Sequence, residues 1–145
     1  MNPGVGRAYY FTSVVGDGNA LHEIRVALRN FDLEPCVFPE ATDLAKQRRN
    51  VLENESIIEK AKKVDIALAV RMLEDSVHSF DVCHLYTSDI DFLPVIQAVR
   101  SRGKKVYVHG YKAGLGKQSP FLHECDLFTD LADMLREECE MVHSS

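Results

Sequence analysis

The sequence lacks any apolar run of the roughly 18 residues that a membrane-spanning helix needs, and it lacks the pattern of a signal peptide. Its hydrophobic residues make up 46% of the chain and are spread over short runs. We therefore expect a protein that is not inserted in a membrane.

Cysteine is scarce and its spacing is uninformative. Cys36, Cys83, Cys125 and Cys139 form no CxxC pair and no Cys/His spacing typical of a zinc site. This scatter argues against a disulfide framework. We expect reduced thiols, as in a cytoplasmic protein.

The sequence also has no excess of positive charge. The chain has 17 Lys and Arg residues against 22 Asp and Glu residues, a net charge of -5. This balance argues against broad, unspecific coating of nucleic acid. Salt screens charges over about 8 Å, so a local basic rim around an acidic pocket stays compatible with it.

Internal repeats, low-complexity tracts and interdomain linkers are also absent from the sequence. A length of 145 residues suits one domain with a sizeable core. We predict a single domain over residues 1–145.

What the chain does contain is an alternation of strand and helix patterns. Helical patterns separate short apolar stretches that are typical of strands. This order predicts an α/β fold in which a mostly parallel central sheet of four or five strands has helices on both faces. The strand patterns lie at residues 7–12, 34–39, 82–86, 106–109 and 126–128.

The most informative stretch is a polar turn with two acids. The apolar strand pattern ends at Thr87. Asp89 and Asp91 follow, two residues apart, and a helical pattern begins near Phe92. Because the carboxyl ends of parallel strands share one edge of a sheet, we expect both acids at the edge where α/β folds place their sites.

Two interpretations of this acidic pair stay open. In the structural one, Asp89 closes a turn and Asp91 caps the following helix. In the functional one, the pair binds Mg²⁺ or Mn²⁺, ions that are held by a few carboxylates plus water. A cation would offset the repulsion of two carboxylates, about 4 kcal/mol at ~4 Å and an effective dielectric of ~20.

Asp65 is a third acid, placed before an apolar helical run at residues 66–73. Its simplest role is the N-cap of that helix. Alternatively, it points to the same sheet edge as Asp89 and Asp91 and completes a metal site.

Four ordered stretches of the sequence carry a family resemblance. They are residues 63–70 (KVDIALAV), 85–95 (LYTSDIDFLPV), 102–106 (RGKKV) and 125–131 (CDLFTDL). Together they resemble the NYN domain of the PIN-like nuclease superfamily. Residues 7–11 and 33–39 are similar to the second and third strands of that family, so the resemblance covers nearly the whole chain.

The resemblance implies a Rossmann-like, PIN-like three-layer sandwich. It also implies one or two Mg²⁺ or Mn²⁺ ions and the hydrolysis of phosphodiester bonds, usually in RNA. Asp65, Asp89 and Asp91 match acids of the family and are the implied catalytic and metal-binding residues. The residues that we expect to contact the substrate are Ser88, Lys63, Arg71 and Lys104.

Six basic residues, Lys63 and Lys104 among them, are candidates for contacts to the phosphate backbone. For any one of these cations, a solvated helix or strand face is the simpler role. They are Lys62, Lys63, Arg100, Arg102, Lys104 and Lys105.

The sequence departs from the family in three respects. The family begins with a strand that ends in an Asp-Gly-X-Asn motif with a metal-binding Asp, and we expect this chain to start after that strand. Residues 17–19 (Asp-Gly-Asn) follow the wrong strand and are interpreted as a turn and helix cap. Arg71 stands where the family usually has an Asp, and it would neutralise part of the acidic cluster or pair with a neighbouring acid. Thr87 replaces a small residue.

Two functions follow from these observations. The first is a Mg²⁺- or Mn²⁺-dependent ribonuclease, weakened by the loss of one acid. The second is a catalytically inactive NYN-fold module that binds RNA or a protein partner. A phosphatase or sugar transferase would need a nucleophile and lysine set that the sequence lacks. Because a missing central strand would expose strand edges, we also expect a homodimer, a partner chain that fills the gap, or a contracted sheet.

Overall fold

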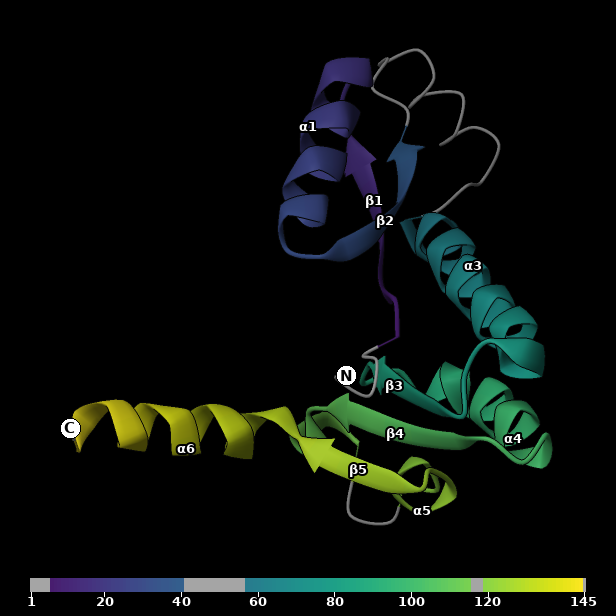
Figure 1. The fold of residues 1–145 in the computed structure, drawn as a ribbon, viewed down its shortest axis with the longest axis vertical. Coiled ribbons are helices and arrows are strands. Elements are labelled where there is room, and N and C mark those ends of the chain that lie inside the picture. The colour runs from purple at the N-terminus through teal and green to yellow at the C-terminus, as the bar shows by residue number, and fades with distance from the viewer. Residues whose placement is uncertain (1–5, 41–56, 116–118, 145) are drawn as a thin grey trace. The chain divides into compact units, whose positions relative to one another are not determined.

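The computed structural model describes residues 6–40, 57–115 and 119–144. The chain divides into two compact units, Met1–Val70 and Arg71–Ser145 (Figure 1). Within the described residues, no helix combines the length and the apolar character that crossing a bilayer demands. All four cysteines are free thiols, as expected.

The first unit is built on a parallel strand pair. β1 (Ala8–Val15) and β2 (Leu33–Glu40) pair along their full lengths and are connected by helix α1 (Gly18–Asn30) (Figure 1). β2 contains two prolines, which cannot donate to a sheet ladder, and it lies at the edge of this two-stranded sheet.

Asp17 fixes the start of α1. Its Oδ1 atom accepts hydrogen bonds from the amides of Asn19 and Ala20, both at 3.0 Å. These are two of the amides that a helix N-terminus leaves without backbone partners. The interpretation of residues 17–19 as a turn and cap is therefore confirmed.

The second unit contains a three-stranded parallel sheet. Its strands are β3 (Val82–Tyr86), β4 (Lys105–Gly110) and β5 (Leu127–Asp130), in the order β3-β4-β5 (Figure 1). A long helix, α3 (Ile57–His78), leads into β3 across the boundary between the units. The remaining elements are η1 (Ile90–Phe92), α4 (Leu93–Ser101), η2 (Lys112–Gly114), α5 (Phe121–Glu124) and α6 (Leu131–His143).

The core of the second unit lies on one face of this sheet. Leu85 of β3 and Val106 and Val108 of β4 are buried, and α4 packs here with Ile96 and Val99, which have no exposed surface. Strand side chains alternate between the two faces, so the opposite face carries the polar and aromatic residues of the same strands.

Helix α4 begins and ends as its sequence predicts. Pro94 occupies the first turn, where a missing N–H costs nothing. At the other end, Gly103 adopts a positive φ of 79°, and its amide donates to the carbonyl of Arg100. Only glycine adopts this conformation without steric cost, so Gly103 terminates the helix as expected.

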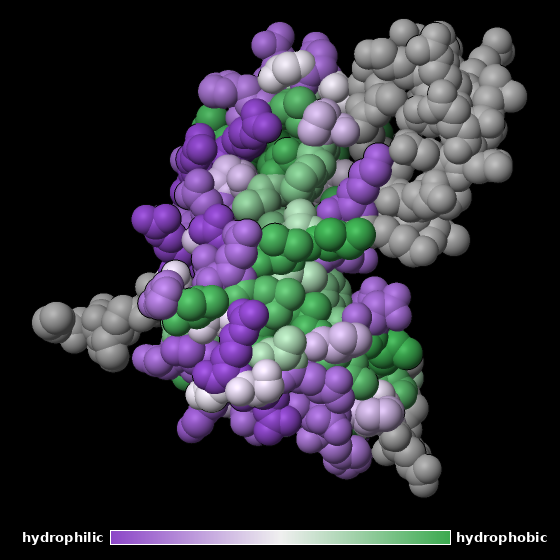
Figure 2. Space-filling model, turned by 90° about the vertical axis from the view of Figure 1, so that its right-hand side faces the viewer, coloured by the Kyte–Doolittle hydropathy of each residue, from purple (hydrophilic) through white to green (hydrophobic). Residues whose placement is uncertain are grey.

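The α/β class and the parallel pairing of all described strands are confirmed. The five strands of the described residues form a two-stranded and a three-stranded sheet, so each sheet is smaller than the expected central sheet. Figure 2 shows hydrophobic side chains reaching the surface among hydrophilic ones. Several of the exposed ones are large, among them Ile66, Tyr86, Leu127 and Leu135.

Candidate metal and nucleic-acid site

Hydrogen bonds fix the polar turn that follows β3. The Oγ1 atom of Thr87 accepts a hydrogen bond from the amide of Asp89 at 3.1 Å. The Oδ1 atom of Asp89 in turn accepts one from the amide of Asp91 at 2.9 Å, which makes Asp89 the cap of the short helix η1. Thr87 therefore organises the turn that presents the acids.

The same turn is attached to the end of β4. The amide of Thr87 donates to the carbonyl of His109 at 3.0 Å, and Ser88 Oγ accepts from the amide of Tyr111 at 2.9 Å. Between these bonds lies Gly110, where a Cβ atom would come within 2.2 Å of the Thr87 carbonyl oxygen. The acids thus stand at the carboxyl edge of the sheet, as predicted, in a turn with a defined position.

Asp89 and Asp91 keep carboxylate oxygens for further ligands. Both residues are exposed, and the cap uses Oδ1 of Asp89. Among the described residues, the carboxylate of Asp91 makes no hydrogen bond or ion pair. The structural interpretation, in which Asp91 caps the following helix, is wrong, because Asp89 caps η1 and α4 begins at Leu93 after Phe92, which makes no side-chain cap bond.

Asp65 lies inside a helix. α3 begins at Ile57, about two turns earlier, so the expected role of Asp65 as an N-cap is wrong. The side chain is half-buried and has an interaction partner. Asp65 belongs to the first unit, whereas Asp89 and Asp91 belong to the second.

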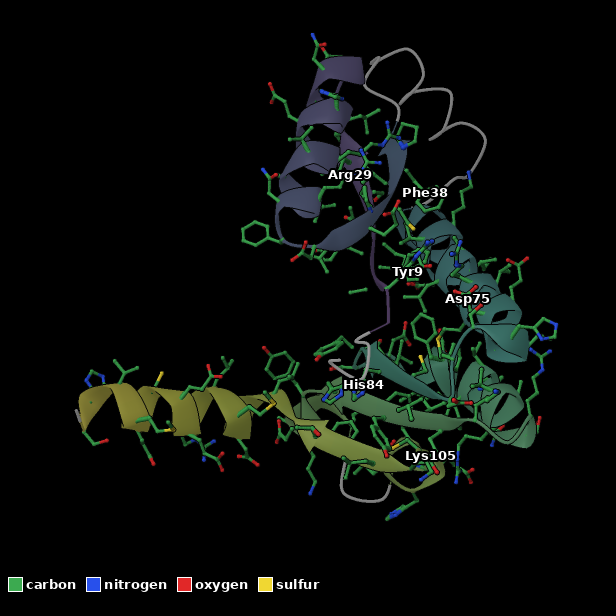
Figure 3. All side chains as sticks on the ribbon, in the orientation of Figure 1. Tyr9, Arg29, Phe38, Asp75, His84 and Lys105 are labelled. Atoms are coloured by element: carbon green, nitrogen blue, oxygen red, sulfur yellow. The ribbon has the colours of Figure 1, made fainter. Side chains whose placement is uncertain are left out.

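The predicted substrate-binding residues Lys63 and Arg71 also lie on α3. Lys63 is exposed and has an interaction partner. Arg71 pairs with Asp75 four residues later, with Nε at 2.8 Å from Oδ2. Its pairing with a neighbouring acid is therefore confirmed, and Figure 3 shows Asp75 on this helix.

Lys104 lies away from the acidic turn. It directly precedes β4, at the amino end of the sheet, and its Nζ atom is 3.3 Å from Oδ1 of Asp81. Strand β4 runs parallel to β3, so Lys104 and the acidic turn stand at opposite ends of these strands. Figure 3 marks this amino end with Lys105.

Arg100 and Arg102 have structural partners. Arg100 contacts the carbonyl of Glu124 and the carboxylate of Asp126. Arg102 donates to the carbonyl of Leu73 and to Ser76 Oγ, which links the C-terminal region of α4 to α3. Neither guanidinium group therefore contacts solvent alone, because each one has partners within the protein.

Sequence analysis missed a histidine pair on the exposed face of the sheet. Nδ1 of His84 lies 2.9 Å from Nε2 of His109, and the ring of His109 stacks on Tyr86 with centroids 4.5 Å apart. His84 also meets the ring of Tyr107 edge-on. A signal was present in the sequence: pairing β3 and β4 in parallel register places these alternate residues on one face.

The pair favours a neutral His109. Burial lowers the pKa of His109 below its ordinary value, and the neighbouring His84 lowers it further. Among the described residues, Nδ1 of His109 is buried without a hydrogen-bond partner. A proton on Nε2 that is donated to His84 leaves Nδ1 as a lone pair, which is the tautomer that this environment suits.

The acidic turn fits a magnesium or manganese ion that keeps most of its water. Mg²⁺ commonly binds through one or two carboxylates together with substrate phosphates. Asp89 and Asp91 supply two exposed carboxylates on one short turn. No group of three or more His, Cys, Asp or Glu side chains suited to a metal occurs in the described part of the chain.

A comparison with known protein families finds a match. The family model described as "NYN domain" matches residues 5–133. Neither the curated proteins nor the solved structures gave a match.

Proposed function

Because the chain belongs to the NYN domain family, whose fold is nuclease-like, we propose that it is a Mg²⁺- or Mn²⁺-dependent ribonuclease. The observation that carries this proposal is the exposed pair Asp89 and Asp91, held on a hydrogen-bonded turn at the carboxyl edge of β3. Parallel α/β sheets place ligands at this edge.

The residues of the turn have distinct roles in this proposal. Asp91 and the Oδ2 atom of Asp89, which the cap does not use, hold one or two divalent ions. Such an ion lowers the pKa of a bound water and stabilises charge on phosphate oxygens. Thr87 and Ser88 hold the turn that carries the carboxylates, through their hydrogen bonds from the amides of Asp89 and Tyr111. The substrate is the phosphodiester backbone of RNA.

Cleavage of a labelled single-stranded RNA with Mn²⁺ tests the function. Asp89→Asn and Asp91→Asn should each lower the rate at least about 100-fold, because a neutral amide is a poor ligand for a hard cation. Asn caps helices as well as Asp does, so Asp89→Asn should keep the turn. The matched control is Asp133→Asn, an exposed acid on α6, which should cleave like the wild type. Equal rates for all four proteins would refute the proposal.

A second candidate is an NYN module without catalysis that binds RNA or a protein partner. Two observations favour it: no three-acid cluster exists among the described residues, and Arg71 stands where the family usually has an Asp. Calorimetry with Mn²⁺ separates the candidates. An absence of binding at millimolar metal would favour the module, whereas binding that Asp91→Asn abolishes would favour the ribonuclease.

We further propose that residues 1–145 work as one domain and that a further strand extends one of the two described sheets. Among the described residues, β1 pairs only with β2, and β3 pairs only with β4. Unpaired strand edges invite a strand from another chain, in a homodimer or with a partner protein. Light scattering of the purified protein tests self-association: a dimer mass is expected for the homodimer, and a monomer mass would rule it out.

A further inference from the structure

Two exposed tyrosines flank the acidic turn. Tyr86 is 67% exposed and Tyr111 is 50% exposed. Tyr86 is the last residue of β3, directly before Thr87, and the amide of Tyr111 donates to Ser88 within the turn. Both aromatic residues are therefore anchored beside Asp89 and Asp91 by the backbone.

The ring of Tyr86 is supported although most of it faces solvent. The ring of His109 stacks on it with an interplanar angle of 20° and a centroid distance of 4.5 Å. His109 is held in turn by the ring of His84, which it contacts through a ring-nitrogen hydrogen bond and a second stack. A supported ring loses little rotational freedom when a planar ligand stacks on it, which lowers the cost of binding.

A positive charge accompanies the tyrosines. Lys112 follows Tyr111 directly, is exposed, and makes no ion pair with any residue that the structure describes. A planar ring next to a free ammonium group complements a nucleotide, which joins a planar base to a phosphate.

We propose that Tyr86 and Tyr111 form a stacking site for unpaired bases of single-stranded RNA, with Lys112 beside the phosphate backbone. RNA as the polymer rests on the proposed ribonuclease function. Stacking on aromatic rings is how proteins hold splayed-out bases, and it tolerates any base because each has a π-face. Bases stacked here would bring the adjoining phosphodiester to the carboxylates of Asp89 and Asp91.

Binding without cleavage tests the stacking site. Fluorescence anisotropy of a labelled single-stranded oligoribonucleotide in EDTA should show Tyr86→Ala binding about 5- to 100-fold more weakly than the wild type, the effect of losing one base–aromatic stack. Tyr86→Phe keeps the ring and should bind within about 3-fold of the wild type. Tyr10→Ala, which removes an exposed tyrosine of β1, is the matched control and should bind normally.

An abasic oligonucleotide of the same length and charge separates stacking from charge. The wild type should bind the intact oligonucleotide more tightly than the abasic one, and Tyr86→Ala should lose that preference. Lys112→Ala should weaken the binding of both oligonucleotides alike. Equal binding of both strands by the wild type would overturn the stacking site, as would unchanged binding by Tyr86→Ala. Capture of a protein partner by this face with no RNA affinity would overturn it too.

The stacking site and the ribonuclease can fail separately. Mn²⁺-dependent cleavage that needs Asp91 but is insensitive to Tyr86→Ala would refute the stacking site alone. Base-dependent binding that Tyr86→Ala removes, with no cleavage under any metal, would refute the ribonuclease and leave the stacking site standing.

Discussion

Nδ1 of His84 and Nε2 of His109 lie 2.9 Å apart on neighbouring strands, so one proton joins the two rings. A second proton between these two nitrogens would set two N–H groups against each other. Burial, the larger cause, and His84 both lower the pKa of His109 in the folded protein. Unfolded chains have a histidine pKa of about 6.5, so in the acidic range the unfolded state binds the proton more readily than the folded state does.

This difference in proton binding determines whether the free energy of unfolding rises or falls with pH. The contribution of His109 to the free energy of unfolding should be complete above about pH 7 and decline as the pH falls through about 6.5. Urea unfolding at several pH values between 5 and 8 measures it. His109→Gln cannot titrate and should flatten the profile, whereas His143→Gln, in an exposed histidine at the end of α6, should leave it unchanged. A steep profile that survives His109→Gln would contradict the prediction.

Gly110 is the point at which β4 approaches the acidic turn most closely. Gly110→Ala would place a Cβ atom 2.2 Å from the carbonyl oxygen of Thr87, so the backbone must move. We expect a loss of about 1–3 kcal/mol in the free energy of unfolding, the usual cost of overpacking, together with weaker Mn²⁺ binding. Gly18→Ala is the matched control, because a Cβ atom there has nothing within 4 Å. A Gly110→Ala protein with unchanged stability and metal affinity would refute this account of the turn.

Asp17 precedes a glycine and an asparagine, and mutations can test whether it acts as a helix cap or as a metal ligand. Asp17→Ala should destabilise the protein by about 0.5–2 kcal/mol, because two amides of α1 lose their acceptor. Asp17→Asn should restore most of that stability, and neither change should alter the affinity for Mn²⁺ in calorimetry. A clear loss of metal affinity in Asp17→Asn would instead identify Asp17 as a ligand.

The features that sequence analysis predicted correctly are those with local causes. Strand β3 was placed from its apolar run, and the end of α4 from Gly103, whose φ of 79° few other residues accept. The α/β class followed from the alternation of such elements. Each of these signals lies within a few residues of the feature that it specifies.

The errors came from weaker or non-local signals. The polar start of α3 has helix-forming residues but a weak hydrophobic stripe, so the helix was expected to begin near Asp65 instead of at Ile57. The contact between His84 and His109 depends on two things. Alternation along each strand signals which residues share a face, but the register of the two strands, which brings these two together, is not fixed by spacing along the chain. Whether Asp89 or Asp91 acts as a cap depends on which carboxylate reaches the unpaired amides of the helix. Both acids lie close enough in the sequence to do so, so the sequence does not decide between them.

Asp126, which directly precedes β5, joins β4 to α4, and its removal gives the last prediction. Its Oδ2 atom accepts a hydrogen bond from the amide of Val106 at 2.8 Å and lies 3.1 Å from Nε of Arg100. Asp126→Ala would leave the amide of Val106 without its acceptor and would remove the carboxylate partner of Arg100, which should cost about 1–3 kcal/mol in the free energy of unfolding by urea.

A matched control separates this role from the loss of any surface acid. Asp133 lies 3.7 Å from Arg136 on α6, and both side chains are mostly exposed. Asp133→Ala should therefore change the free energy of unfolding by no more than about 1 kcal/mol. Asp126→Asn should fall between Asp126→Ala and the wild type, because its amide oxygen can still accept from Val106. Equal stability of Asp126→Ala and Asp133→Ala would mean that Asp126 does not join β4 to α4, and that other contacts hold the sheet edge in place.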